Sequence, residues 1–492
     1  MSFSLFPQNF GKLYISNFYK KIFFGKDKNL ITTDHGAWVL LNDREFRLLR
    51  TQKVHDNPEL FNVLKEKGII ITEDNFEKIA EIQKKRLNFL FNGPILHIMI
   101  PTLKCNMGCI YCHSLAKPPN ENKWDMNKDT AKATIDFILT SPSDDLTIEF
   151  QGGDCLMNFD ALRFIIEYAT KKAKEKNKRI WFTLVTNLTL MTDEILNFLR
   201  KNHVVGISTS LDGPKKVHDK NRKYLGGDGT YDDVVYWINR INKKYGKYFS
   251  LNALTTITKY SLPYAKEIVD EYYKLGFRTI WPRFLNDLGS AHFTWNKIGY
   301  SAEEYIKFYK ELLEYVIETN KKNKRILEGY SFYISQKILN EYPVSNVDMW
   351  SPCGAGIGQL LYNHNGDIFT CDEAKILGDE FKLGNVKRNS IKEVVNHPTV
   401  ISMMNISSKL PLICDNCPYS PYCFVCPVHF YQTQGNIVPK LAGDFRCKIQ
   451  KEMIKTVFKK ILFSKEDRNI FFNWMHLPGI PREKIVKMND FL

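Results

Sequence analysis

Three cysteines stand within eight residues in the segment CNMGCIYC, at Cys105, Cys109 and Cys112. The C-x3-C-x2-C spacing brings three thiolates into one short loop, which suits three irons of a [4Fe–4S] cluster and leaves the fourth iron open. An incomplete set of protein ligands is typical of catalytic metal sites. The alternative is a zinc loop completed by a distant ligand such as His113. The fold must therefore present this loop with room for one further ligand.

The chain around this loop alternates between strand-like and helix-like segments. From residue 95 onward, strand-like runs occur at 95–103, 146–152, 180–187, 205–212, 251–258 and 278–286, with helix-like segments at 129–140, 158–174, 192–201, 231–244 and 262–275. This alternation predicts an α/β fold, with a parallel sheet curved into a partial (β/α)6 barrel and helices outside it. Active sites in such folds lie at the carboxyl ends of the strands, where the cysteine loop begins.

The cysteine loop and the strand ends resemble the radical S-adenosylmethionine (SAM) superfamily. The segment FQGGDCLM at 150–157 is similar to the family's GGE motif, with Asp in place of Glu. The resemblance implies that the open iron binds the amino and carboxylate groups of SAM, and that reductive cleavage of SAM yields a 5′-deoxyadenosyl radical. It further implies SAM contacts from Tyr111 near the adenine, from the backbone of Gly152 and Gly153, from Asp154 at the ammonium group, and from Asn187, Ser210 and Arg222 at the ribose and carboxylate. A helix cap is the ordinary alternative for a lone Asn or Ser at a strand end.

Seven further cysteines lie in the C-terminal part of the chain: Cys353, Cys371, Cys414, Cys417, Cys423, Cys426 and Cys447. Paired C-x2-C motifs also suit a zinc ribbon, which stays open from these residues alone. The pattern, with four residues between Gly366 and the second of these cysteines, resembles the SPASM domain of radical SAM enzymes that modify peptides. It departs from the family once, with C-x2-C where C-x3-C is usual.

The SPASM resemblance implies two auxiliary [4Fe–4S] clusters. One would be held by Cys414, Cys417, Cys423 and Cys447, and the other by Cys353, Cys371 and Cys426, with its fourth position open or held by another kind of ligand. Only Cys155 is then left over, as a small buried hydrophobe or a reactive thiol. Asp372 follows Cys371 directly, and the resemblance implies that an acid here accepts a substrate proton. The alternative is a surface or hydrogen-bonding aspartate.

The length of 492 residues predicts roughly three domains and a tail. We expect a recognition module over 1–93, the barrel over 94–325, the SPASM domain over 326–448 and a helical basic tail over 449–492. Strand-like runs followed by helices make the first module winged-helix-like and similar to the peptide-recognition elements of ribosomal peptide maturases. Such elements take up a leader peptide as an added strand. An ordinary cap on the barrel is the alternative.

Composition and charge limit the kinds of partner and the compartment that we expect for this protein. The formal net charge is +15, but the basic residues are spread in short runs, so we expect no specific nucleic-acid partner. The chain lacks a stretch of about 18 apolar residues, so we expect no membrane span. Its first ten residues do not resemble a signal peptide, which predicts a cytoplasmic protein. In that reducing compartment, clustered cysteines serve metals or catalysis rather than disulfides.

Together, the resemblances imply a SPASM peptide maturase. The segments at 150–154 and 369–379 are similar to those of the His-Xaa-Ser system type. Such an enzyme would take a hydrogen atom from a bound precursor peptide, install a cross-link or an oxidised side chain, and need an electron donor such as flavodoxin or ferredoxin. A second interpretation is sulfatase-maturase-like oxidation of Ser or Cys to formylglycine. A third is a non-enzymatic iron–sulfur or zinc protein that transfers electrons or binds a partner.

Overall fold

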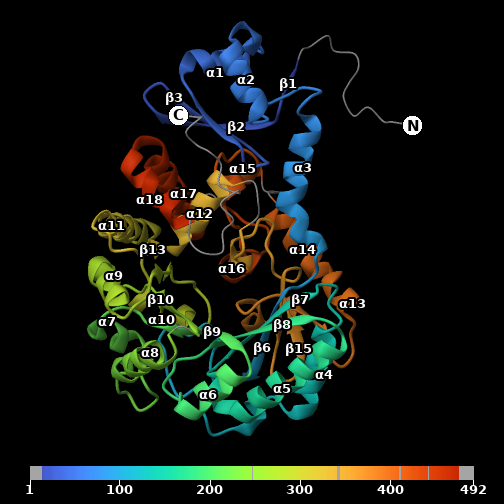
Figure 1. The fold of residues 1–492 in the computed structure, drawn as a ribbon, viewed down its shortest axis with the longest axis vertical. Coiled ribbons are helices and arrows are strands. Elements are labelled where there is room, and N and C mark those ends of the chain that lie inside the picture. The colour runs from blue at the N-terminus through green and yellow to red at the C-terminus, as the bar shows by residue number, and fades with distance from the viewer. Residues whose placement is uncertain (1–13, 247, 341–343, 409–411, 442, 476–492) are drawn as a thin grey trace.

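The computed structural model describes residues 14–475, apart from 247, 341–343, 409–411 and 442. The first thirteen residues of the expected N-terminal module and the last seventeen of the expected tail lie outside this range. Figure 1 places the N-terminal module at the top and the barrel at the bottom, with the cysteine-rich part between and beside them. In the described part of the chain, no helix is long and apolar enough to cross a membrane.

The N-terminal module is an antiparallel sheet covered by helices. The sheet has the order β2 (Tyr19–Gly25), β3 (Lys28–Thr33), β4 (Trp38–Leu41), and the helices are α1 (Asp43–Arg50), α2 (Pro58–Glu66) and α3 (Phe76–Leu87). A second pair joins β1 (Ile15–Ser16) to β5 (Ile70–Ile71). Helix α1 begins at a capping box formed by Asn42 and Glu45, which satisfies free backbone N–H groups at its first turn.

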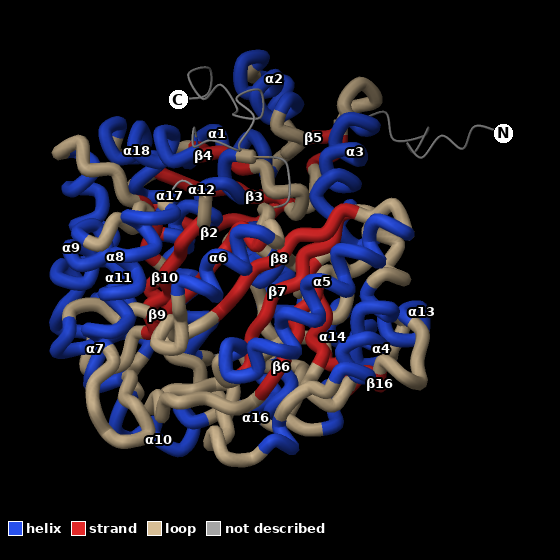
Figure 2. Tube along the Cα trace, turned by 60° about the horizontal axis from the view of Figure 1, so that its bottom comes forward, coloured by secondary structure: helices blue, strands red, loops and turns tan. Residues whose placement is uncertain are grey.

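A parallel sheet forms the barrel, as expected. Its strands run in the order β12 (Pro282–Arg283), β10 (Ser250–Thr256), β9 (Val204–Ser210), β8 (Arg179–Val185), β7 (Asp145–Gly152), β6 (Leu96–Thr102). Helices alternate with these strands and lie on the outside (Figure 2): α4 (Lys128–Ile138), α5 (Phe159–Glu175), α6 (Asp193–Lys201), α8 (Tyr231–Tyr245) and α9 (Ala265–Lys274). The α/β prediction is confirmed.

The sixth strand differs from the single run expected at 278–286. The structure divides it into β11 (Thr279–Ile280), which pairs with β13 (Leu327–Glu328), and β12, which pairs with β10. Pro282 has no N–H to give to a ladder and restricts the residue before it, so the strand changes partner at this point.

The barrel sheet continues into the cysteine-rich region. Strand β14 (Gln359–Tyr362) adds in parallel to the edge of β6, and β15 (Asp367–Phe369) and β16 (Lys382–Asn385) follow antiparallel, so the sheet has nine strands. Helices α13 (Ile391–Val395), α14 (Pro398–Ser407) and α16 (Pro427–Gln434) lie beside them. The two cysteine regions therefore share one sheet.

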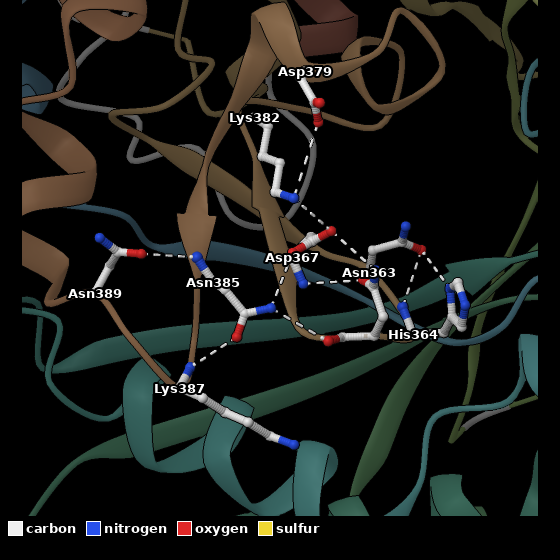
Figure 3. A network of polar contacts seen from close by, with 9 residues as sticks. Asn363, His364, Asp367, Asp379, Lys382, Asn385, Lys387 and Asn389 are labelled. Carbon is white, nitrogen blue, oxygen red and sulfur yellow. Dashed lines mark hydrogen bonds and ion pairs between the residues drawn. The ribbon is translucent and has the colours of Figure 1, made fainter.

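A network around Asp367 ties these last strands together (Figure 3). Its carboxylate accepts a hydrogen bond from Asn385 Nδ2 at 2.9 Å and pairs with Lys382 Nζ at 2.9 Å. Burial opposes its ionisation, but these two partners hold the pKa of Asp367 below its ordinary value. Gly366 makes the turn into β15 with a φ of +87°, a conformation that favours glycine. This turn aims β15 towards Cys371.

The predicted tail is part of the core. Helices α17 (Phe445–Phe463) and α18 (Lys465–Met475) pack against α11 (Ala302–Lys321) and α12 (Gly329–Leu339). Helix α17 runs across the predicted boundary at 448/449, so Cys447 and the tail share one helix. The ring of Phe458 on α17 contacts Phe24 and Trp38 of the N-terminal module. The division into four segments stays a prediction.

We predict that Tyr362→Phe lowers the free energy of unfolding by about 1 to 3 kcal/mol, because it leaves a buried ring nitrogen without its partner. The Tyr362 hydroxyl lies 2.8 Å from Nδ1 of His97, and this pair joins β14 to β6. Burial lowers the pKa of His97 to about 3, so the imidazole is neutral. Urea unfolding followed by circular dichroism measures the change. Tyr236→Phe, on the exposed face of α8, is the control and should leave the midpoint unchanged.

Candidate active site

The first cysteine group lies in the loop that follows β6. Burial raises the pKa of Cys105 to about 12, and the charges of Asp154, Cys109 and Cys112 add to the rise. Burial also raises the pKa of Cys109 to about 11, although the Arg222 guanidinium opposes this. Three thiols close enough to repel one another as thiolates are the arrangement the spacing predicted. Cationic iron would relieve that repulsion, since metal binding releases thiol protons.

Gly152 and Gly153 allow the chain to approach itself. A Cβ on Gly152 would overlap the Thr102 carbonyl oxygen, and one on Gly153 would overlap those of Leu103 and Lys104. Gly153 N donates to Thr102 O at 3.1 Å, and Asp154 N donates to Lys104 O at 2.8 Å. The glycines thus hold the end of β7 against the start of the cysteine loop, a role that sequence reasoning missed.

Asp154 is buried and already hydrogen-bonded. Its carboxylate accepts from Thr186 Oγ1, from the backbone N of Asn187 at 2.8 Å and from the backbone N of Leu156 at 3.0 Å. Burial raises its pKa, and these donors oppose the rise. Asn187 in turn donates through Nδ2 to Asn106 Oδ1 at 2.9 Å, inside the cysteine loop. Asp154 therefore fixes the loop after β8, in addition to any contact with SAM.

Tyr111 belongs to a buried chain of polar groups. Arg222 Nη1 donates to the Tyr111 hydroxyl at 2.9 Å, and that hydroxyl donates to Asp212 Oδ2 at 2.7 Å. Asp212, which the sequence did not single out, also accepts from Asn221 Nδ2 at 3.1 Å. Its only signal in the sequence was its position two residues after the end of β9. Ser210 ends that strand and is half-buried.

The C-terminal cysteines form two separate groups. Burial raises the pKa of Cys423, and the thiolates of Cys417, Cys447 and Cys414 raise it further. We call these four the outer quartet. Burial likewise raises the pKa of Cys371, with the charges of Asp372, Glu373, Cys426 and Cys353 adding to it. We call Cys353, Cys371 and Cys426 the inner trio. Both sets match the allotment that the resemblance implied, and their role as ligands stays a prediction.

Asp372 reaches from the inner trio to the cysteine loop of the barrel. Its Oδ2 lies 3.4 Å from Nε2 of His113, the residue after Cys112. Burial opposes its ionisation, but His113 and Arg283 prevail and lower the pKa of Asp372 to about 2. Burial raises the pKa of Glu149 on β7, and the charge of Asp372 adds to that rise. Asp372 is therefore an ionised group that faces barrel residues.

Glu373 completes this polar region beside the inner trio. It accepts a hydrogen bond from Asn286 Nδ2 at 2.6 Å, and its other oxygen lies 3.7 Å from Cys426 Sγ and 3.9 Å from Arg446 Nη1. Two buried atoms here, Asn286 Oδ1 and Arg446 Nε, have no hydrogen-bond partner among the described residues. Buried polar atoms of this kind call for a ligand or water.

The leftover thiol has a partner of its own. Cys155 is buried, and its Sγ donates to the Val185 carbonyl at 3.2 Å. Burial raises its pKa well above the ordinary value, which keeps it a neutral thiol.

The donor set suits iron–sulfur clusters. Three or four thiols gather in each of the three groups, close enough for their charges to raise one another's pKa, and each thiolate of a [4Fe–4S] cluster binds its own iron. These residues would hold three clusters, and Cys105, Cys109 and Cys112 would leave one iron open.

Two surface hollows lie elsewhere, along α11 and α17, with volumes of about 420 and 650 Å3. Lysines and glutamates line them, and none of the eleven cysteines does. We locate the chemistry at the cysteine groups instead, because the reactive residue types and the perturbed pKa values gather there.

Comparison with known proteins agrees with this geometry. Residues 99–280 match the Radical SAM superfamily, and residues 353–418 match the SPASM family, an iron-sulfur cluster-binding domain. The chain is 25% identical to a cysteine-type anaerobic sulfatase-maturating enzyme of Clostridium perfringens, over 65% of this chain and 84% of that one. It is 23% identical to the radical SAM cyclopropyl synthase TigE of Paramaledivibacter caminithermalis, over 96% of this chain and 94% of that one. A solved structure titled native anSMEcpe with bound AdoMet and Cp18Cys peptide superposes with a TM-score of 0.64 at 22% identity, covering 77% of this chain and 99% of that one.

We predict that iron content falls in steps as each cysteine group is removed. The anaerobically reconstituted protein should hold about twelve irons, and replacing Cys105, Cys109 and Cys112 together by Ala should leave about eight. The same count is expected when Cys414 and Cys417 are replaced. Cys155→Ala is the control and should retain all of the iron. Stoichiometric zinc, with iron confined to the barrel loop, would contradict the two auxiliary clusters.

Proposed function

This chain is a radical SAM enzyme with a C-terminal SPASM domain, and we propose that it oxidises a residue of a peptide held between the cysteine loop and Asp372. The observation that carries the proposal is the 3.4 Å approach of Asp372 to His113. It brings an ionised carboxylate from the SPASM domain next to the loop of Cys105, Cys109 and Cys112. A substrate lying there would meet the radical source on one side and a proton acceptor on the other.

We assign the remaining predicted roles as follows. Tyr111, Gly152, Gly153, Asp154, Asn187, Ser210 and Arg222 would surround SAM at the strand ends, and the outer quartet and inner trio would each hold an auxiliary cluster. When bound, SAM and its cluster supply the radical that removes a hydrogen atom from the substrate. Asp372 would accept a proton from the reacting residue, since His113 and Arg283 lower its pKa and keep its carboxylate ionised at neutral pH.

A peptide substrate is supported by the relatives and by the N-terminal module. The similar proteins include sulfatase-maturating enzymes, and one similar structure, that of anSMEcpe, contains a bound peptide. Strand β2 is an edge strand, since among the described residues it pairs only with β3. Phe18 and Phe23 are 55% and 61% exposed there. A precursor peptide added to β2 would gain main-chain hydrogen bonds and contacts to these two rings.

The proposed electron donor and cellular compartment follow from the proposed chemistry. Reductive cleavage of SAM needs one electron, which an acidic carrier such as flavodoxin or ferredoxin would supply to this basic protein. A reducing compartment such as the cytoplasm would keep the thiols ready for iron. The bond formed and the His-Xaa-Ser subtype stay predictions.

A second candidate is the oxidation of Ser or Cys to formylglycine. The match to the cysteine-type maturase over 84% of its length favours it. Formylglycine formation from Ser and a cross-link each remove two hydrogens, so fragmentation mass spectrometry and an aldehyde-reactive hydrazide separate the two reactions, because only formylglycine carries an aldehyde. The test incubates the reconstituted protein with SAM, dithionite and either a Cys- or Ser-containing sulfatase peptide or a short precursor peptide encoded beside the gene. Release of 5′-deoxyadenosine with no mass change in any peptide would contradict both.

We predict that Asp372→Asn lowers modified-peptide formation by about a hundredfold or more, because a general base contributes about 10² to 10⁴ to a rate. SAM cleavage should persist, since Asp372 lies on the SPASM side of the site. Liquid chromatography of 5′-deoxyadenosine and product from the same reactions measures both. Asp379→Asn, whose side chain is 95% exposed, is the matched control and should behave as the parent. Equal losses of both products would show that Asp372 serves SAM binding instead.

A further inference from the structure

The outer quartet is surrounded by lysines that come from three distant parts of the chain. They are Lys20 on β2, Lys337 on α12 and Lys451 on α17. Lys451 lies four residues after Cys447 on α17, so the two share one face of the helix. Lys337 Nζ donates to the backbone oxygen of Cys423, and Lys20 Nζ donates to Ser420 in the loop of the quartet. All three lysines thus lie on the segments that surround the quartet.

Lys20 belongs to the N-terminal module, yet its ammonium lies at the quartet's own loop. The residue is 3% exposed, and its Nζ donates to Ser420 Oγ at 2.9 Å and to Asp34 Oδ1 at 2.5 Å. Ser420 lies between Cys417 and Cys423, two members of the quartet. Asp34 offsets the cost of burying this ammonium group, and the contact with Ser420 holds the ammonium at the loop of the quartet.

The same loop is held by three more hydrogen bonds from the module. Thr32 Oγ1 donates to Pro418 O at 2.9 Å, Arg86 Nη2 donates to Pro421 O at 3.2 Å, and the Tyr422 hydroxyl donates to Gly36 O at 3.1 Å. The N-terminal module therefore forms one wall of the outer quartet, and Lys20 and Arg86 are cationic groups in that wall.

Lys337 approaches the quartet from the other side. Its Nζ donates to Cys423 O at 3.1 Å and lies 5.7 Å from the centre of the Phe424 ring. The residue is 6% exposed. Lys20 and Lys337 are thus both buried beside the quartet, although they come from separate elements. Lysines that serve only to keep a surface solvated would be exposed.

The inner trio has a more balanced environment. Asp372 follows Cys371 directly, and Glu373 Oε2 lies 3.7 Å from Cys426 Sγ. These carboxylates and Asp348 interact with the cations Arg283, Arg446 and Lys375. At the outer quartet, by contrast, the three lysines outnumber the two carboxylates that contact them or the quartet, Asp34 and Asp444. Cys423 and Cys426 are three residues apart and belong to different groups, so the segment 423–426 joins them.

We propose that Lys20, Lys337 and Lys451 are positioning residues that raise the reduction potential of the outer-quartet cluster above that of the inner-trio cluster. The physical reason is that reduction adds one negative charge, which nearby cations stabilise and nearby carboxylates oppose. An electron on the inner cluster then moves to the outer one, which is reduced by one electron as the inner is reoxidised. The outer cluster returns to its oxidised state by passing that electron to an oxidised one-electron carrier protein. Only the origin of the electron, in substrate oxidation, rests on the proposed function.

The test is a redox titration followed by electron paramagnetic resonance. It uses the reconstituted full chain in which Cys105, Cys109 and Cys112 are replaced by Ala, so that only the auxiliary clusters contribute. Loss of one signal on further replacement of Cys353 by Ala assigns the inner cluster. We expect the outer midpoint potential to be the more positive of the two. Lys20→Met and Lys337→Met should each move it to a more negative value and leave the inner potential in place.

Matched variants separate charge from packing. Lys21→Met removes the neighbouring lysine, which faces the opposite side of β2 over the Phe46 ring, and should leave both potentials unchanged. Thr32→Val removes a hydrogen bond to the same loop without removing charge, and Lys20→Arg keeps the charge; both should retain the parent potential. If Lys20→Met fails to assemble the outer cluster, the test rests on the other two variants: Lys337→Met should lower the outer potential, and Lys20→Arg should keep it.

Three outcomes would overturn the proposal. One is an outer potential below the inner one in the parent. The second is no shift in the lysine-to-methionine variants that keep their iron. The third is a shift in Thr32→Val as large as that in Lys20→Met. None of these depends on any peptide, so a failure here and a failure of the peptide proposal are distinguishable.

Discussion

The parallel pairing of β14 with β6 determines how the two cysteine regions meet. Strand β6 ends at the loop of Cys105, and β14 leads through the β15 hairpin to Cys371 and Asp372. Backbone bonds begin this pairing, with Ile95 and Leu96 both donating to Gly358 O at 3.0 Å. Strand β15 runs antiparallel to β14, with Ile368 opposite Tyr362 and Phe369 opposite Leu361, so the chain returns towards the beginning of β14 before it reaches Cys371 and Asp372. The contact of Asp372 with His113 joins this returning segment to the loop that follows β6. A slip of one residue in either pairing would turn the side chains to the other face of the sheet.

Burial of many thiols imposes a second constraint. Each thiolate in a dry site destabilises its neighbours, so the cysteine groups favour the neutral thiol until a cation enters. A different basic residue lies beside each cysteine group and favours the thiolate. Arg222 lies near Cys109, Arg446 lies near Cys426, and lysines surround the outer quartet. These basic residues come from distant segments, so assembly of the cysteine sites and folding of the whole chain are coupled.

The sequence allowed much of the fold to be predicted where the signal is local. Five barrel strands and their helices lie within a few residues of the segments expected from periodicity. The spacing of Cys105, Cys109 and Cys112 indicated the first cysteine group, and the family resemblance implied the other two. The features that could not be predicted from the sequence depend on pairing between distant segments. The β14 to β6 ladder joins residues about 260 positions apart. Nothing near Gly153 signals that the carbonyls of residues 103 and 104 will lie against it. Asp212 likewise looks like any aspartate after a strand until Tyr111 and Asn221 are brought to it.

The sheet of the N-terminal module packs on two sides, and this explains why a segment that resembles a separate recognition element is so deeply joined to the rest. One face, with Ile31, Val39 and Leu41, covers α1 and α2 in a small core of its own. The other face, with Leu30 and Trp38, joins the main core, and Trp38 Nε1 donates to Ile338 O at 2.9 Å. Lys20 lies at this second face, 400 residues from its partner Ser420. A strand added at the edge of β2 would therefore pair with the same backbone that carries Lys20 to the outer quartet.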